Sequence, residues 1–269
     1  MLLAIDCGNT NIVMSVYDGA AQRALWRIET HPAPTVEQLI ASVDERLPEG
    51  GAAALSGLVA ASVVPDITAI LRQFGHALGL RALIIGDADI DVGVDVDVPH
   101  PEQVGADRIV NATACLERGQ VPAIIIDFGT ATTFDVVLGT PARARYAGGV
   151  IAPGVNLSVA ALSAAAARLP EMNIEAWGAD TPILGRTTDE AMQAGILWGY
   201  VGLVEGILSR LITSLSDAGQ SGPTGAPPTI LATGGLAPLY APHIQAISGV
   251  EQDLTLRGLC HIYAMNKDI

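Results

Sequence analysis

Two short segments repeat an aspartate followed two residues later by glycine, each directly after an apolar run. They are Ala4-Ile-Asp6-Cys-Gly8-Asn-Thr10 and Ile125-Ile-Asp127-Phe-Gly129-Thr-Ala131. Glycine permits a tight turn and lets backbone N–H groups approach an anion closely. The aspartate at the strand end can hold a metal ion or its water shell. One such segment is common in proteins, but two copies at equivalent places predict a phosphate-binding site.

A third glycine turn, Thr233-Gly234-Gly235, follows the apolar run Thr229–Ala232 and would suit the sugar and base side of a nucleotide. The chain has a single lysine, Lys267, close to its C-terminus. A P-loop needs a lysine inside its glycine-rich loop, so this type of NTPase is excluded. An enzyme that forms a Schiff base on lysine is nearly excluded for the same reason.

The first half of the chain predicts strands and helices that would hold the first turn. Strands are expected at Leu2–Ile5, Ile12–Tyr17 and Arg23–Ile28, with an Asp18-Gly19 turn between the last two. A helix is expected from Pro34 to Leu47, capped by Thr35. Strands are also expected at Leu58–Val64 and Ala82–Ile85, and a helix between them at Ile67–Leu78. Residues 86–104 should form a loop with an edge strand, and a helix should run from Gly105 to Arg118.

The second half repeats this pattern. Strands are expected at Ala123–Ile126, Thr133–Leu138 and near Ala144–Ile151. Helices follow at 155–168 and 188–216, a linker at 217–228, the strand Thr229–Ala232, a short helix, and a last helix from about Leu256. Strands alternating with helices indicate an α/β protein, and short turns between the opening strands indicate mixed sheets. The echo of the first turn in the second predicts a duplicated domain whose equivalent turns face each other across a cleft.

Composition limits the function further. A chain of 269 residues that is 50% apolar and 16% charged is long enough for about two domains with a core. The net charge of −14 would repel a phosphate backbone, so nucleic acid is not an expected partner. The uncharged runs 146–167 and 218–250 are broken by Gly, Pro and Asn, so no membrane helix is expected there. The N-terminus lacks a basic segment, and we expect a cytoplasmic protein.

The three phosphate-type turns together resemble the ATP site of the superfamily of acetate kinase, sugar kinases, the heat-shock chaperone and actin. The segment Gly105-Ala-Asp107-Arg108 resembles the signature of type III pantothenate kinases. Further motifs match that family in order along nearly the whole chain: Tyr146-Ala-Gly-Gly-Val-Ile-Ala-Pro-Gly154, Gly185-Arg-Thr-Thr188, Thr233-Gly-Gly-Leu236 and Leu254-Thr-Leu-Arg-Gly-Leu259.

The resemblance implies two actin-like (ribonuclease H-like) domains, 1–118 and 119–269, with mixed sheets, ATP in the cleft between them, and dimerisation helices in the second. It implies phosphorylation of pantothenate, the first step towards coenzyme A, by a homodimer. Asp107 would be the general base, and Arg108 would hold the substrate. Asp127 would bind a monovalent cation, potassium or ammonium, and magnesium would arrive with ATP. The implied ATP-binding residues are Asp6, Cys7, Gly8, Asn9, Thr10, Asn11, Ile12, Val13, Thr130, Gly234 and Gly235, and the implied pantothenate-binding residues are Gly105, Ala106, Asp107, Arg108 and Thr188, the last from a dimer-related subunit.

One segment departs from the family pattern. The family often has a Tyr and an Asn just before the signature, where this chain has Val98-Pro99-His100-Pro101. An aromatic lid and an amide are therefore missing or supplied elsewhere, which affects substrate affinity more than the reaction.

Alternatives remain open at this stage. Asp107 and Arg108 are also consistent with a surface pair at a helix start, where aspartate favours the helix dipole. The thiol of Cys7 favours packing over chemistry. The run Trp198-Gly-Tyr200-Val-Gly202 suits a packed interface, but it would also fill the core of one subunit. The protein is alternatively a kinase for another small hydroxylated metabolite, or a non-catalytic nucleotide-binding regulator of the same fold. Loss of Asp6, Asp107 or Asp127 would mark such a regulator, and all three are present.

Overall fold

The computed structural model describes residues 1–47, 50–140, 142–165, 172, 174, 181–220 and 227–267. The chain forms two compact units. Unit 1 comprises Met1–Gly119 and Asp253–Ile269, and unit 2 comprises Gln120–Gln252.

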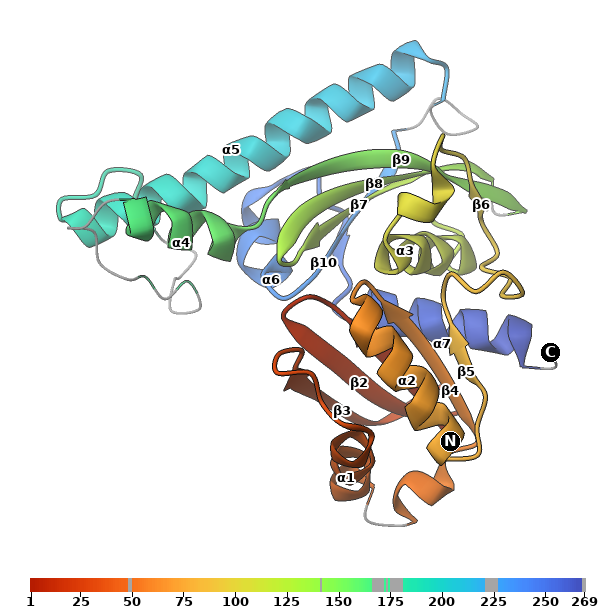
Figure 1. The fold of residues 1–269 in the computed structure, drawn as a ribbon. Coiled ribbons are helices and arrows are strands. Elements are labelled where there is room, and N and C mark those ends of the chain that lie inside the picture. The colour runs from red at the N-terminus through yellow and green to blue at the C-terminus, as the bar shows by residue number, and fades with distance from the viewer. Residues whose placement is uncertain are drawn as a thin grey trace. The chain divides into compact units, whose positions relative to one another are not determined.

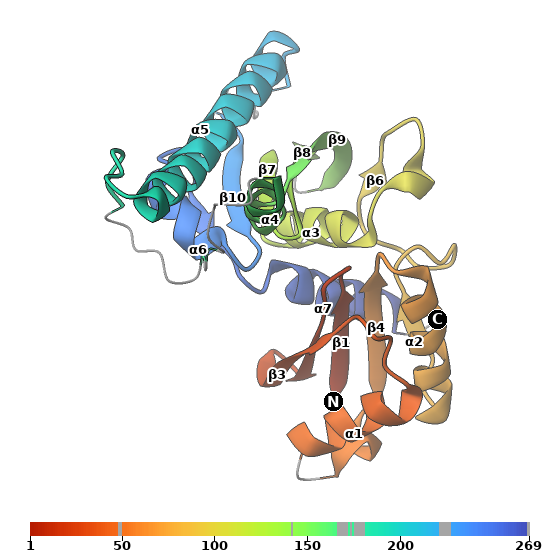
Figure 2. The ribbon, with the colours of Figure 1, turned by 60° about the vertical axis from the view of Figure 1, so that its left-hand side comes forward.

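The sheet of unit 1 has the strand order β3-β2-β1-β4-β5. The strands are β1 (Leu2–Cys7), β2 (Asn11–Asp18), β3 (Ala21–Glu29), β4 (Gly57–Ser62) and β5 (Ala82–Ile84). The pairs β1–β2 and β2–β3 are antiparallel, whereas β1–β4 and β4–β5 are parallel. The sheet is therefore mixed, as predicted, and β1 lies beside β4 at its centre (Figure 2).

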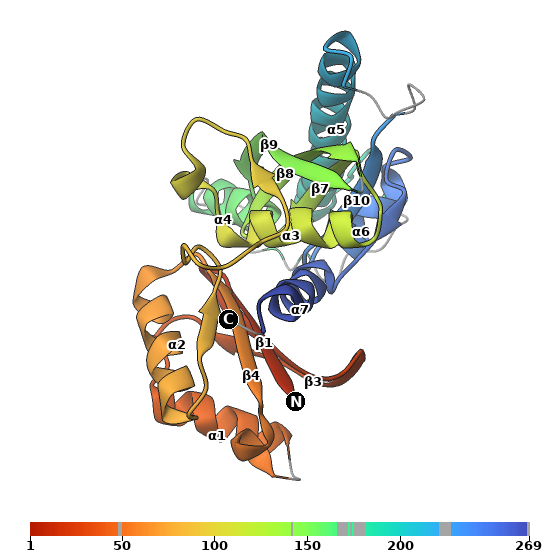
Figure 3. The same cartoon turned by 90° about the vertical axis from the view of Figure 1, so that its right-hand side faces the viewer.

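Helices cover both faces of this sheet (Figure 3). On one face, α1 (Val36–Arg46) and α2 (Pro65–Ala77) pack against the side of β1 that carries Leu3 and Ile5. On the other face, α7 (Leu254–Asn266) packs against Ala4. The predicted cap of α1 is confirmed, because the Thr35 side chain accepts a hydrogen bond from the backbone N–H of Gln38. Because alternate residues point to opposite faces, Asp6 shares the face of Ala4.

The helix α3 (Ala106–Glu117) packs closely on α7 within unit 1. A Cβ atom at Gly258 of α7 would lie 2.4 Å from the backbone oxygen of Val110, so only glycine allows this approach. Before α3, the chain forms β6 (Asp95–Val96) and a 3₁₀ turn at Pro101–Gln103, in the region predicted as a loop with an edge strand. A second 3₁₀ turn, at Gly51–Ala54, was not predicted.

Unit 2 repeats the topology of unit 1. Its strands β7 (Ala123–Phe128), β8 (Ala131–Thr140), β9 (Arg143–Pro153), β10 (Thr229–Thr233) and β11 (Gly249–Val250) have the order β9-β8-β7-β10-β11. The pairs β7–β8 and β8–β9 are antiparallel, and β10 pairs in parallel with both β7 and β11. The predicted duplication of an actin-like domain with a mixed sheet is therefore confirmed, because these five strands pair in the same order and directions as the five strands of unit 1.

Among the residues that the structure describes in unit 2, three α-helices accompany this sheet: α4 (Val155–Ala165), the long α5 (Thr188–Asp217) and the short α6 (Ala237–Tyr240), which is followed by a 3₁₀ turn at Ala241–His243 (Figure 1). A capping box of Thr187 and Glu190 starts α5. One side of α5, with Leu197, Val204 and Leu208, packs into the core of unit 2.

By length and composition, α5 is also apolar enough to cross a membrane, and only 28% of its most apolar window is buried. A core helix passes the same test. Charged Glu205 and Arg210 lie within α5, and charges inside a membrane span are costly.

The observed elements differ from the predicted ones mainly at their ends. The last helix starts at Leu254 and packs on α3, β1 and β4, so the chain from Asp253 onward belongs to unit 1 and not to the second half. The strand β11 was not predicted, because two residues carry no pattern. The helix predicted at 155–168 is described to Ala165, and positions 166–168 lie outside the described residues, as do 221–226 of the predicted linker.

Candidate active site

The first turn, defined here as Asp6–Asn11, connects β1 to β2 in unit 1. Its backbone closes with a hydrogen bond from the N–H of Gly8 to the oxygen of Asn11 at 3.0 Å. The buried Thr30, which directly follows β3, holds this turn through two hydrogen bonds. Its hydroxyl donates to the backbone oxygen of Gly8 at 2.7 Å, and its N–H donates to the backbone oxygen of Thr10 at 3.1 Å. Asn9, Thr10 and Asn11 are exposed, so the turn presents polar groups to a ligand.

The following strand anchors the turn in the core. Ile12 is buried and Val13 is half-buried, and Cys7 is buried with the pKa of its thiol raised by burial. Cys7 and Ile12 both belong to the core cluster under α1 and α2. The side chains of these two residues therefore pack, and only their backbone remains for a role in binding.

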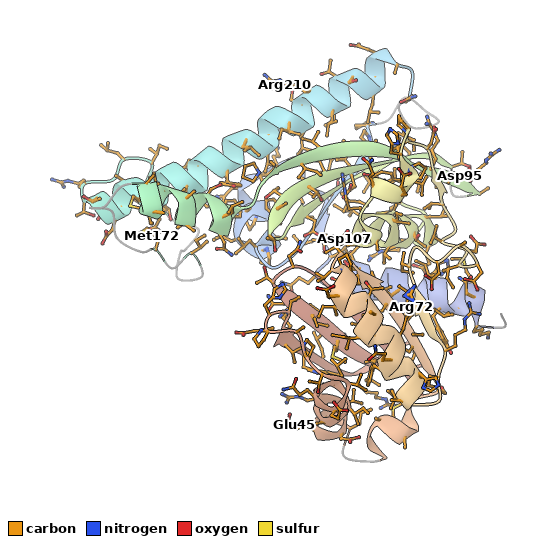
Figure 4. The ribbon with its side chains drawn as sticks, in the orientation of Figure 1. Glu45, Arg72, Asp95, Asp107, Met172 and Arg210 are labelled. Atoms are coloured by element: carbon orange, nitrogen blue, oxygen red, sulfur yellow. The ribbon has the colours of Figure 1, made fainter. Side chains whose placement is uncertain are left out.

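Two aspartates of unit 1 share an electrostatic environment. Asp6 is half-buried near the end of β1, and Asp107 lies in the first turn of α3 (labelled in Figure 4). Burial, and after it the negative charge of Asp107, raise the pKa of Asp6 from its ordinary 3.8 to about 7. Burial also raises the pKa of Asp107, although the N–H and the guanidinium of Arg108 act in the opposite direction. Acids whose pKa values are raised by burial and by a neighbouring like charge are typical of an active site.

Glycine at position 105 leaves room for the carboxylate of Asp107 in its observed position. The carboxylate folds back over the helix start, where its Oδ1 accepts the N–H of Arg108 at 2.9 Å. A Cβ atom at Gly105 would lie 2.5 Å from that same oxygen. Gly105 is the N-cap residue of α3, and as a glycine it offers no side chain to cap the helix. The Gly-Ala-Asp-Arg spacing thus places a carboxylate on the positive end of a helix.

The second turn, Asp127–Ala131, lies in unit 2 against the third turn. Its backbone closes from the N–H of Gly129 to the oxygen of Ala131 at 3.1 Å. Because β10 is parallel to β7, Thr233 pairs with Asp127, and Gly234 comes next to the carboxylate. A Cβ atom at Gly234 would lie 2.4 Å from Oδ1 of Asp127, and φ of Gly234 is +89°. The second and third turns therefore form one structure, and any side chain at position 234 would break it.

The remaining residue of the second turn that was predicted to bind ATP is Thr130, whose side chain is exposed. The backbone of Thr130 lies close to Gly154, which directly follows β9. A Cβ atom at Gly154 would lie 2.0 Å from the backbone oxygen of Thr130. Gly235, the second glycine of the third turn, is exposed, and a Cβ there would meet nothing within 4 Å.

The residues around Asp127 fit a hard alkali cation. Carboxylate oxygen is a ligand that such ions prefer, and glycine at position 234 keeps a Cβ atom from lying 2.4 Å from the Oδ1 atom of Asp127. In the part of the chain that the structure describes, no three His, Cys, Asp or Glu side chains are arranged to hold a metal ion.

The other predicted substrate residues lie on helix starts. Ala106 is the first residue of α3, beside Asp107 and Arg108 in unit 1. Thr188 is the first residue of α5 in unit 2, and its side chain is exposed next to the capping box. The structure thus brings Asp6 together with Asp107, and Asp127 with Gly234, each pair within one unit.

Sequence reasoning missed Thr30, which anchors the first turn, and the buried Asp135 in β8. Thr30 gives no local signal, because it acts through strand pairing. Asp135 has one: a carboxylate inside the apolar strand Thr133–Leu138 is buried and must have partners.

The duplicated sheets and their glycine turns define a protein of the actin-like class of nucleotide-binding domains. Residues 2–210 match the family described as Type III pantothenate kinase. A Type III pantothenate kinase of Paramagnetospirillum magneticum is 44% identical over 99% of this chain and 98% of its own length, and one of Rhodospirillum rubrum is 43% identical over 99% of each chain. The chain belongs to the type III pantothenate kinase family.

A solved structure supports the fold alone. A protein from Campylobacter jejuni, described as a conserved Baf family transcriptional activator, covers 99% of this chain and 100% of its own, with a TM-score of 0.60 and 17% identity.

Proposed function

We propose that this protein transfers the γ-phosphoryl group of ATP to the primary hydroxyl of pantothenate, the first step of coenzyme A biosynthesis. Membership of the family and the names of its relatives support this reaction. The observation that carries the catalytic part is the acid pair of unit 1: Asp107 stands at the start of α3 with a raised pKa, and its charge also raises that of Asp6.

In the proposed reaction, the hydroxyl oxygen of pantothenate bonds to the γ-phosphorus and the bond to the ADP oxygen breaks. The proton of the hydroxyl passes to the carboxylate of Asp107. A general base works best when its pKa lies near the working pH, which suits the raised pKa of this group. Phosphoryl transfer otherwise needs mainly positioning and charge neutralisation. Gly105, Ala106 and Arg108 would orient the substrate beside the base.

The exposed backbone and side chains of the first turn would bind the phosphates of ATP, with Thr130 and the glycines 234 and 235 as further contacts. We propose that magnesium enters with ATP and that Asp6 faces its water shell. The buried environment of Asp6 supports this role, because a cation would favour the ionised form that burial disfavours.

A potassium or ammonium ion would be held by Asp127. When bound, such an ion would neutralise part of the phosphate charge, which a protein with a single, remote lysine must offset by other means. The glycine surroundings of the Oδ1 atom support this assignment.

We further propose a cytoplasmic homodimer formed through α5, with Thr188 completing the pantothenate site of the other subunit. The face of α5 opposite its core side carries glycines at 195, 199, 202 and 206. Of these, the first three are exposed, and a Cβ there would meet nothing within 4 Å. We call these four residues the glycine seam. Their spacing of four, three and four residues lets a second helix approach closely.

The proposed function is tested by measuring ADP release from ATP with and without pantothenate. The measurement is made once in potassium salts and once in choline salts. Wild-type protein should release ADP only when pantothenate is present, and Asp107→Asn should lose about a hundredfold to ten-thousandfold in kcat while still binding ATP. Release with a sugar or acetate instead of pantothenate would replace this function by another kinase activity. ATP binding without turnover on any acceptor would favour a regulator.

A further inference from the structure

Asp135 in β8 is fully buried, yet none of the roles above uses it. Its two carboxylate oxygens accept hydrogen bonds from two hydroxyls: Oδ1 from Tyr146 of β9 and Oδ2 from Thr133, each at 3.1 Å. Tyr146 is itself almost completely buried. Burying a carboxylate is costly even with partners, so its presence calls for a reason beyond the sheet.

The internal duplication supplies a control within the same chain. In unit 1, β1 and β2 pair Asp6 with Val13; in unit 2, β7 and β8 pair Asp127 with Thr133. Two residues further along, unit 1 has Ser15 where unit 2 has Asp135. Unit 1 therefore forms the same strand order with Val13 opposite its aspartate, and with a serine at the position that corresponds to Asp135. The hydroxyl and the acid are particular to the unit that carries Asp127.

Strand pairing puts Thr133 next to Asp127. Directly opposite residues of an antiparallel pair project to the same face, with Cβ atoms about 4.5–5.5 Å apart. The hydroxyl of Thr133 donates a hydrogen bond to Asp135, so the lone pairs of its oxygen are available to a cation. A Cβ atom at Gly129 would lie 3.4 Å from the Oδ1 atom of Asp127, and one at Gly234 would lie 2.4 Å from it, so a side chain at position 234 would crowd this oxygen.

We propose that Thr133 is a second protein ligand of the monovalent cation at Asp127, and that Asp135, steadied by Tyr146, is the positioning residue that orients the Thr133 hydroxyl. This inference rests on the proposed function, since the cation at Asp127 is part of it. Groups that hydrogen-bond to a metal ligand fix the orientation of that ligand and so affect the affinity for the metal.

The test measures cation binding without turnover. Thermal unfolding of the full chain is followed against potassium chloride at constant ionic strength, with choline chloride as the balancing salt, with and without a non-hydrolysable ATP analogue and always without pantothenate. The variants are Thr133→Val, which has the shape of threonine and the residue type of unit 1, Thr133→Ser as the matched control that keeps the hydroxyl, and Asp135→Asn.

Thr133→Val should raise the potassium concentration for half-maximal stabilisation by about tenfold or more. Its midpoint in choline alone should be lower than that of the wild type, because the buried Asp135 loses a hydrogen-bond donor, so the potassium response of each variant is measured relative to its own midpoint in choline. Thr133→Ser should keep the wild-type concentration, and Asp135→Asn should raise it. A wild-type potassium response in Thr133→Val would overturn the proposal, and so would a wild-type protein that potassium does not stabilise. If Asp135→Asn does not fold, the Thr133 pair still decides. Pantothenate-dependent ADP release by the wild type is measured separately, so failure of the proposed function is distinguished from failure of this inference.

Discussion

The glycine seam of α5 allows a prediction in which a monomer and a dimer respond in opposite directions. The perturbation is the double substitution Gly199→Ala and Gly202→Ala. Within one chain, the added methyl groups meet nothing within 4 Å. Alanine favours a helix over glycine by about 1 kcal/mol per residue. The isolated chain should therefore gain about 2 kcal/mol, which corresponds to an increase of roughly 4–8 °C in the thermal midpoint of a domain of this size.

In a dimer packed along the seam, the same methyl groups enter the contact between the two helices. Overpacking of a close contact typically costs about 1–3 kcal/mol. The dimer dissociation constant should then rise by roughly five- to a hundredfold. Sedimentation equilibrium from nanomolar to micromolar concentrations measures this constant, and unfolding at two protein concentrations measures the stability. Wild-type protein should sediment at about twice 27.7 kDa at micromolar concentration.

The control is the opposite substitution, alanine to glycine, in a helix of unit 1. Ala41 is exposed on α1, and Ala41→Gly should lower stability by about 1 kcal/mol without changing association. An unchanged dimer dissociation constant in the stabilised double variant would refute the seam as the interface. A monomeric wild type with full activity would refute the dimer itself. Mixing Asp107→Asn with Thr188→Arg should restore some activity if each site uses both subunits, and no recovery would leave only the interface.

The other predictions concern single residues of the two turns. Asp127→Ala should abolish both turnover and its dependence on potassium, and full wild-type activity in choline salts would contradict the cation role. Gly234→Ala should weaken ATP binding and lower stability by roughly 1–3 kcal/mol, because its Cβ meets the Asp127 carboxylate at a positive φ; calorimetric titration with ATP and urea unfolding test this. The raised pKa of Asp6 means that the ligand-free protein loses stability as the pH rises from near 3.8 to about 7, since the folded state then holds a proton that the unfolded chain releases. Asp6→Asn should reduce that loss in urea unfolding at several pH values, and an identical pH dependence would contradict the buried pair.

The sequence predicts the sheets better than it predicts how the chain is divided. Strands such as Ala123–Phe128 have continuous apolar patterns, and the Thr35 cap has a local signature, so both are recognisable without a structure. The return of α7 to unit 1 has no such signature. It depends on a contact between distant segments, in which Gly258 of α7 meets the backbone of Val110 in α3.

The same distinction applies to the candidate site. Asp6, Asp107 and Asp127 stand in recognisable local motifs, and a single sequence is enough to single them out. The pKa shift of Asp6 is not contained in its motif, because it arises from burial and from an acid about a hundred residues away along the chain. Thr30 and Asp135 act through strand register, which a turn motif does not specify.

The two aspartates of the duplicated turns show how one topology yields different chemistry at equivalent positions. Asp6 pairs across its strands with Val13 and shares its surroundings with another acid, so its charged form is disfavoured in the ligand-free protein. Asp127 pairs with Thr133, whose hydroxyl is held by a buried carboxylate, and it lies against two glycines. The first environment suits a group that becomes ionised when a divalent cation arrives with a nucleotide. The second environment suits a carboxylate and a hydroxyl that together bind a monovalent ion. Exchange of Val13 and Thr133 should therefore affect potassium dependence through position 133 and not through position 13, a difference that the duplication makes measurable within one chain.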